Sequence, residues 1–175
     1  MALQTKTVTA NGSRGHHKFT LTVTEESVNT NTNVSVLSFT FVISPISTGY
    51  SWSSFSNQKY TITIGDATYT GTLASYNGSS TVTIRTVSDI SVAHNANGSK
   101  SITVGFVYDD SSSVNYTPGD ASSSATMTLT AIARGIVYID NGTSFDAYQI
   151  FIDNGSSWDQ YAPYIDNGTS WDLYS

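Results

Sequence analysis

The chain has 175 residues, only 11% of them charged, and a formal net charge of −6. This length fits one compact domain, or one domain with a small appendage. The negative charge argues against a nucleic-acid partner, since nucleic acids are bound through basic residues. Cysteine is absent, which excludes disulfides and thiolate metal sites.

The charge is distributed unevenly. Residues 1–134 contain seven Lys/Arg and seven Asp/Glu and are therefore neutral, whereas residues 135–175 contain six Asp and no basic residue. This shift predicts a domain of residues 1–134 followed by a tail of residues 135–175. No apolar run reaches the 18 residues of a membrane span, and the N-terminal residues do not resemble a signal peptide. We expect a soluble protein without a membrane partner.

Period-two alternation of apolar and polar residues dominates residues 1–134 and predicts β-strands. The first apolar set is Phe19, Leu21 and Val23. Residues 34–43 follow with two apolar faces, which predicts a central strand with one face in the core and the other partly covered. Further strands are predicted at residues 59–64, 68–73, 81–87, 100–107 and 125–133.

Turn signals separate these runs, as at Asn77-Gly78 and Asn97-Gly98, because Asn-Gly supplies the positive φ angles of tight turns. Many short strands without helical segments predict an all-β, antiparallel β-sandwich. An immunoglobulin-like (Ig-like) topology and a jelly roll both fit this pattern.

Three segments resemble a family of siphophage tail structural proteins. Residues 91–102 read SVAHNANGSKSI, close to the family's VAHNADGSKS run before an amphipathic strand. Residues 31–39 resemble its NxSxVxW/F strand. Residues 116–119 (YTPG), together with 125–134, resemble its YxPG…SxxMxLTxIPRA closing strand.

The resemblance implies a phage or prophage tail protein with an Ig-like domain and no catalysis. Two features depart from the family. Its closing Ile-Pro-Arg is Ile132-Ala133-Arg134 here, and its members continue into further large domains, whereas this chain continues into a short repeat tail.

The tail contains three copies of one unit, which begin at Tyr138, Phe151 and Tyr164 with a spacing of 13 residues. A two-residue Asn-Gly turn in each unit predicts the aromatic cross-strand pairs Tyr138–Phe145, Phe151–Trp158 and Tyr164–Trp171. A single hairpin of this size is marginal in water. The units are therefore expected to stack on each other, on the sandwich or on other copies of the chain.

The tail aromatic residues have two interpretations. We favour a structural one, in which they form the core of the array or an oligomer seam, over a ledge that stacks on sugar rings. The candidate ligand or assembly residues are Tyr138, Phe145, Tyr148, Phe151, Trp158, Tyr161, Tyr164, Trp171 and Tyr174.

Other candidate sites are weaker. Asp140, Asp153 and Asp166 offer oxygen ligands for calcium, but their spacing does not match an EF-hand loop and Asp-Asn-Gly is a common turn former. His16 and His17 are expected on opposite faces of a strand, and His94 is expected to bond backbone.

No catalytic motif stands out. Glu25 and Glu26 are neighbours, expected at a strand end, and the cluster of Tyr50, Trp52 and Phe55 is interpreted as core edge.

The sequence thus predicts a non-enzymatic virion structural protein of a tailed phage, located in the phage particle and without a cofactor. Its tail would mediate homo-oligomerisation. A trimer is favoured because fibre-like phage parts are usually trimeric. Other virion proteins would be its partners. The alternative is a host-surface adhesin that binds a bacterial cell-surface glycan through the tail aromatic residues.

Overall fold

A computed structural model of the chain describes residues 2–53 and 58–132 in full. Of the tail it describes the backbones of five strands: β9 (Ile136–Asp140), β10 (Phe145–Asp153), β11 (Trp158–Tyr161), β12 (Tyr164–Asp166) and β13 (Trp171–Leu173). None of the described residues forms a helix long and apolar enough to cross a membrane.

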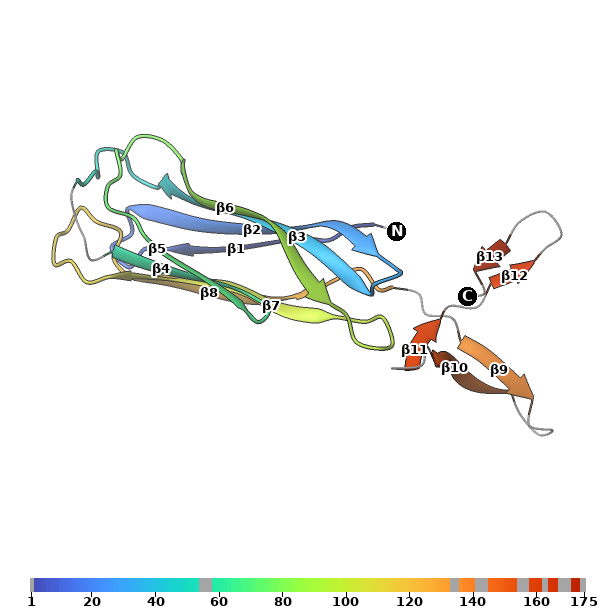
Figure 1. The fold of residues 1–175 in the computed structure, drawn as a ribbon. Coiled ribbons are helices and arrows are strands. Elements are labelled where there is room, and N and C mark those ends of the chain that lie inside the picture. The colour runs from blue at the N-terminus through green and yellow to red at the C-terminus, as the bar shows by residue number, and fades with distance from the viewer. Residues whose placement is uncertain are drawn as a thin grey trace.

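The body is a β-sandwich of two antiparallel four-stranded sheets (Figure 1). The first sheet has the order β1 (Thr5–Asn11), β2 (His17–Asn29), β3 (Val34–Pro45), β6 (Val82–Ala93). The second has the order β5 (Ala67–Thr72), β4 (Gln58–Ile64), β7 (Ser101–Asp110), β8 (Ala121–Thr128). The predicted fold class is confirmed.

The strand order also separates the two predicted topologies. Strands β2 and β3 pair within one sheet and β7 and β8 pair within the other, while β4 pairs with the distant β7. In immunoglobulin terms the second sheet has the order C′-C-F-G, and the neighbours β3 and β6 correspond to B and E. The body therefore has an Ig-like topology, with β1 as an additional strand that pairs with β2 at the edge of its sheet.

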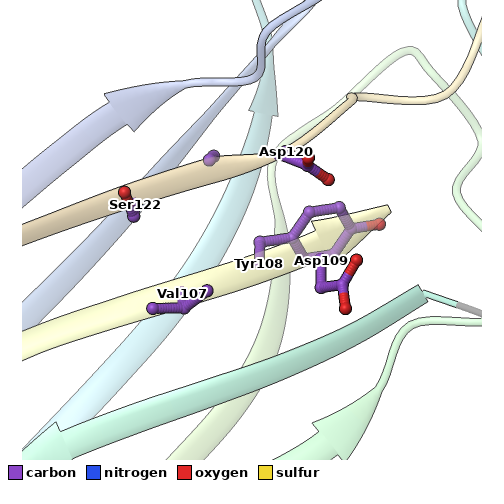
Figure 2. Close-up of a pocket in the computed structure, with 6 residues that line it drawn as sticks. Val107, Tyr108, Asp109, Asp120 and Ser122 are labelled. Atoms are coloured by element: carbon purple, nitrogen blue, oxygen red, sulfur yellow. The ribbon is translucent and has the colours of Figure 1, made fainter. Parts of the chain in front are cut away.

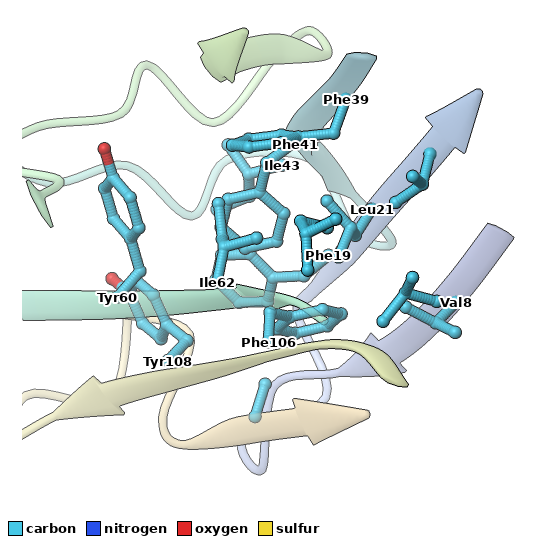
Figure 3. Packing of buried hydrophobic residues seen from close by; sticks show 14 of the residues in the cluster. Val8, Phe19, Leu21, Phe39, Phe41, Ile43, Tyr60, Ile62, Phe106 and Tyr108 are labelled. Atoms are coloured by element: carbon cyan, nitrogen blue, oxygen red, sulfur yellow. The ribbon is translucent and has the colours of Figure 1, made fainter. Parts of the chain in front are cut away.

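Alternation along the strands places the apolar side chains between the sheets, as predicted. Phe19, Leu21 and Val23 of β2 are fully buried, and the outward residues of β3 are only half-buried. Aromatic rings from both sheets meet in the core, with ring centroids 4.3 Å apart for Phe19 and Tyr108 and 4.9 Å apart for Phe41 and Phe106 (Figure 3). Each such buried side chain stabilises the fold by about 1.5–3 kcal/mol.

Four strands differ from the predicted elements, among them β7, which continues past residue 107 to Asp110. Strand β1 was not among the predicted elements, β6 continues past residue 87 to Ala93, and β8 begins at Ala121 and ends at Thr128 instead of spanning 125–133. The extension of β6 passes Asp89, which has a φ of 60°, close to the irregular pairing between Leu37 and Phe39. A bulge of this kind lets a strand continue where alternation breaks down.

The loops of the sandwich gather at its two ends. One end, on the left in Figure 1, carries the connections β1–β2, β3–β4, β5–β6 and β7–β8. The N-terminus and the residues that lead out of β8 lie at the other end. There the backbone N–H of Ile132 donates to the carbonyl of Gly98 over 2.9 Å. The predicted domain boundary near Arg134 falls on residues 133–135, outside the described residues.

Candidate functional site

The tail hairpins have a different register from the predicted one. Tyr138 lies opposite Ala147, Phe151 opposite Gln160, and Tyr164 opposite Leu173. Four residues, not two, therefore separate the last paired positions of each hairpin. The predicted aromatic pairs are wrong, because Asn-Gly marks a turn without fixing the length of the loop.

The same register recurs in all three units. Each repeated aspartate lies opposite the aromatic residue that begins the return strand: Asp140 opposite Phe145, Asp153 opposite Trp158, and Asp166 opposite Trp171. Tyr148 lies opposite Val137 and Tyr161 opposite Ile150. The side chains of these residues, and all of Tyr174, lie outside the described residues, so the predicted calcium ligands and sugar ledge stay predictions.

The first two units share a strand, whereas the third stands apart. Strand β10 pairs with β9 through residues 145–149 and with β11 through residues 150–153, in a three-stranded sheet. Strands β12 and β13 form a separate two-stranded sheet. Pro163 occupies the repeat position that Ile150 holds within β10. Proline cannot donate to a β-ladder, so the third unit lacks the backbone donor that Ile150 can supply at this position.

A buried polar cluster closes the body where the chain leaves β8. Glu25 was expected at a strand end, but β2 continues to Asn29 and Glu25 takes its next inward position, 1% exposed. The Ser35 hydroxyl donates to Glu25 Oε1 over 2.6 Å and lies 2.8 Å from His94 Nε2. The Thr130 hydroxyl and backbone N–H donate to Glu25 Oε2 over 2.5 and 3.1 Å.

These residue types resemble a catalytic triad, but their geometry does not. The carboxylate contacts the serine instead of the imidazole, and the Nδ1–H of His94 donates to the Gly98 carbonyl over 2.9 Å, so the expected backbone bond of His94 is confirmed. Ser35 is fully buried, which leaves a substrate no access to its hydroxyl. The cluster is a structural network that ties residue 130, next to the tail, to strands β2 and β3.

The loop end of the sandwich holds an aromatic cluster around His17. His17, the first residue of β2, is fully buried, whereas His16 precedes the strand and is half-buried. The expectation that the two lie on opposite faces of one strand therefore does not apply to His16. The His17 ring meets those of Trp52 and Tyr76 edge to face, with centroids 5.2 Å apart in each case. Burial lowers the pKa of His17, and its Nε2–H donates to the Tyr50 carbonyl over 2.9 Å. His17 is therefore a neutral core residue.

Trp52 and Tyr76 join two loops of this end. Their backbones exchange two hydrogen bonds of 2.9 Å across an isolated antiparallel bridge between the β3–β4 and β5–β6 connections. Both side chains are 4% exposed, which confirms the core-edge interpretation for Trp52. Tyr50 stacks on His16 with centroids 3.5 Å apart, and Phe55 lies outside the described residues.

An ion pair fixes the remaining two loops. Arg14, in the β1–β2 turn, donates to Asp110 Oδ2 over 2.7 Å and to the Ser112 carbonyl over 2.5 Å. Burial alone would raise the pKa of Asp110, but hydrogen bonds from Thr117, Gly119 and Ser112 and the charge of Arg14 lower it. The β7–β8 loop is thus held against the β1–β2 turn.

Two hollows on the surface of the body are candidate ligand sites. One, of about 650 Å³, lies at the loop end and is lined by Ser51, Trp52, Ser53, Ser75, Tyr76, Asn77 and Tyr116. The other, of about 310 Å³, lies along β7 and β8, with Asp109 and Asp120 near one end and the 53%-exposed Val107 toward the other (Figure 2). Among the described residues no group of three or more acidic or histidine side chains is arranged to hold a metal ion.

Comparison with protein-family models, with curated proteins and with solved structures gives no match. The loop-end hollow was not predicted as a site. The sequence does carry a signal for it, because Tyr, Trp, Ser, Asn and Gly are enriched in the loops between the predicted strands.

Proposed function

We propose that the chain is a virion structural protein of a tailed phage, in which the repeat tail joins copies of the chain. The segments that resemble siphophage tail proteins support the virion assignment. The longest of them, residues 91–102, runs from the end of β6 to the start of β7 and includes His94. The Ig-like topology agrees with the fold that this resemblance implies.

The arrangement of the tail strands is the observation that supports assembly of copies through the tail. Among the described tail strands, β10 alone pairs on both sides, and the others, three to five residues long, are edges of a three-stranded and a two-stranded sheet. Sheets this small are marginally stable in water, and open edges accept further strands. A second copy supplies strands of the same sequence and register, and a closed symmetric ring of copies satisfies every edge. We favour a trimer.

Light scattering at micromolar concentration tests this assembly. We expect the mass of a trimer of the 18.8 kDa chain. We also expect stronger association at high salt, because each tail brings six aspartates that repel those of its neighbours. Ile152→Pro, which interrupts β10, should yield monomers, and Val107→Asp on the exposed face of the body should not. A monomeric wild type, or dissociation caused by Val107→Asp alone, would overturn tail-mediated assembly.

Quantitative mass spectrometry of purified particles tests the virion assignment separately. We expect a fixed copy number per particle that is divisible by three. Absence of the chain from intact particles would overturn the assignment, even if the purified protein is a trimer.

The second candidate function is glycan binding by the tail. The recurrence of Phe145, Trp158 and Trp171 at one register position favours it. The double variant Trp158→Ala/Trp171→Ala should then lose binding to host cells, and unchanged binding would contradict it.

A further inference from the structure

The loop end of the body is built like a recognition surface. In immunoglobulin-type sandwiches the connections B–C and F–G lie together at one end. Here their equivalents, β3–β4 and β7–β8, lie together with β5–β6 at the end opposite the exit toward the tail (Figure 1). The described parts of these loops are rich in Ser, Tyr, Asn and Gly, the residues that antibody loops use for adaptable polar contacts and rigid aromatic ones.

All three loops contribute to the hollow of about 650 Å³, a volume typical of small-ligand sites. Trp52 and Tyr76 are the buried members of its lining, whereas Tyr116 is 43% exposed. The remaining lining residues, Ser51, Ser53, Ser75 and Asn77, are exposed and polar. The hollow thus presents one exposed aromatic ring, that of Tyr116, together with hydroxyl and amide groups, beside two nearly buried rings.

The chemistry of the lining selects a ligand class. None of the seven lining residues is charged, so the site offers no counter-ion to an anionic or cationic ligand. An exposed tyrosine ring next to hydroxyl and amide groups suits a ligand with apolar C–H faces and many hydroxyl groups. In addition, the buried indole N–H of Trp52 has no hydrogen-bond partner among the described residues, whereas buried donors are normally paired. We infer that the three loops form a binding site for a neutral saccharide.

The site is also preorganised, which reduces the entropy lost on binding. The two backbone bonds between Trp52 and Tyr76 hold two of its walls together. The Tyr76 hydroxyl donates to the Ser80 carbonyl over 2.8 Å, which fixes the ring. A Cβ atom at Gly78 would lie 2.6 Å from the Tyr50 carbonyl oxygen, so glycine allows the close approach of the loops.

This inference does not depend on assembly through the tail, and the test separates the two. The full-length variant Trp158→Phe/Trp171→Phe keeps Trp52 as the single tryptophan, because the chain has three. Its binding is screened on a printed array of neutral hexose and N-acetylhexosamine oligomers and of uronic-acid oligomers. The oligomers that bind are then titrated in solution while Trp52 fluorescence is recorded.

We expect binding to neutral oligomers with a change in Trp52 fluorescence. Tyr116→Ala removes the exposed aromatic ring of the hollow, and Ser75→Arg places a longer side chain in it. Each should weaken binding at least tenfold, while Val107→Ala on β7 leaves binding unchanged. Thermal unfolding of each variant verifies its fold. The inference is overturned if no neutral oligomer binds, if uronic-acid oligomers bind equally well, if the loop variants bind like the parent, or if the protein captures a protein partner at this end but no saccharide.

Discussion

Glu25→Gln should lower the free energy of unfolding of the body by about 1–3 kcal/mol at neutral pH. The wild-type carboxylate is 1% exposed. It accepts hydrogen bonds from the hydroxyls of Ser35 and Thr130 and from the backbone N–H groups of Thr130 and Gln4. Glutamine replaces one acceptor oxygen by an NH₂ group that faces donors. If the NH₂ group takes the place of Oε1, the Ser35 hydroxyl loses its acceptor, and if it takes the place of Oε2, the Gln4 N–H and the Thr130 hydroxyl lose theirs. Each donor left without an acceptor costs about 1–3 kcal/mol before relaxation.

The pH dependence of this loss follows from the pKa of Glu25. Burial alone would raise that pKa, but the hydrogen bonds from Ser35, Thr130 and Gln4 outweigh burial and lower it below 4.5. Because the native pKa lies below the unfolded one, the stability due to the carboxylate is complete above pH 4.5 and is lost as the pH falls through the native pKa. The difference between wild type and variant should therefore shrink in acid.

Urea unfolding followed by circular dichroism, at neutral pH and at about pH 3, measures both effects. The matched control is Glu26→Gln, which changes the exposed neighbouring carboxylate that accepts from Ser38, and we expect a change within about 0.5 kcal/mol. Equal losses in the two variants, or a Glu25→Gln loss that is as large in acid as at neutral pH, would refute the reasoning.

Three further predictions concern other parts of the chain. Arg14→Met removes the partner of the buried Asp110 carboxylate and, because the Arg14 side chain is 22% exposed, should cost somewhat less than breaking a fully buried pair, about 2–4 kcal/mol in urea unfolding. Lys18→Met at an exposed position should cost less than about 0.5 kcal/mol, and similar costs would contradict this. Burial lowers the pKa of His17 from 6.5, so the stability that it gives as a neutral ring is lost as the pH falls below that value. His17→Phe should make the thermal midpoint less sensitive to pH below 6.5, and an unchanged slope would contradict the argument. Pro163→Ile gives the third unit the residue that Ile150 supplies within β10. Amide hydrogen exchange of residues 161–164, measured by mass spectrometry, should then become slower. Unchanged exchange would show that another feature separates β11 from β12.

The sandwich was predictable where one face of a strand is apolar and the other polar. Strand β2 follows this rule, and its apolar residues are buried as predicted. Strand β3 carries apolar residues on both faces, and its more apolar face is the buried one. Strand β8 begins with Ala121 and three serines, whose small polar side chains carry no alternation. Its position is fixed by pairing with β7, where Tyr108 lies opposite Ala121. Such long-range pairing leaves no mark in the local pattern.

The tail shows a related limit. Moving a hairpin partner by two residues keeps every side chain on its original face, because the side-chain period of a strand is two. The alternating pattern of Tyr138, Ile139 and Asp140 therefore fits the predicted register and the observed one equally well. The Glu25 cluster was missed for a different reason, since its members lie between 10 and 105 residues apart in sequence and only the topology brings them together.

The placement of the loops and of the chain exit at opposite ends of the body has a consequence for binding strength. Copies joined through their tails would each keep a loop end clear of the junction, so a trimer would present three equivalent hollows to one surface. After the first contact, the others form at a high effective concentration, which raises the overall avidity by about 10²–10⁴ where geometry permits simultaneous contact. A hollow with weak intrinsic affinity for a single saccharide would then suffice to hold a repetitive polysaccharide, and would still release an isolated chain end.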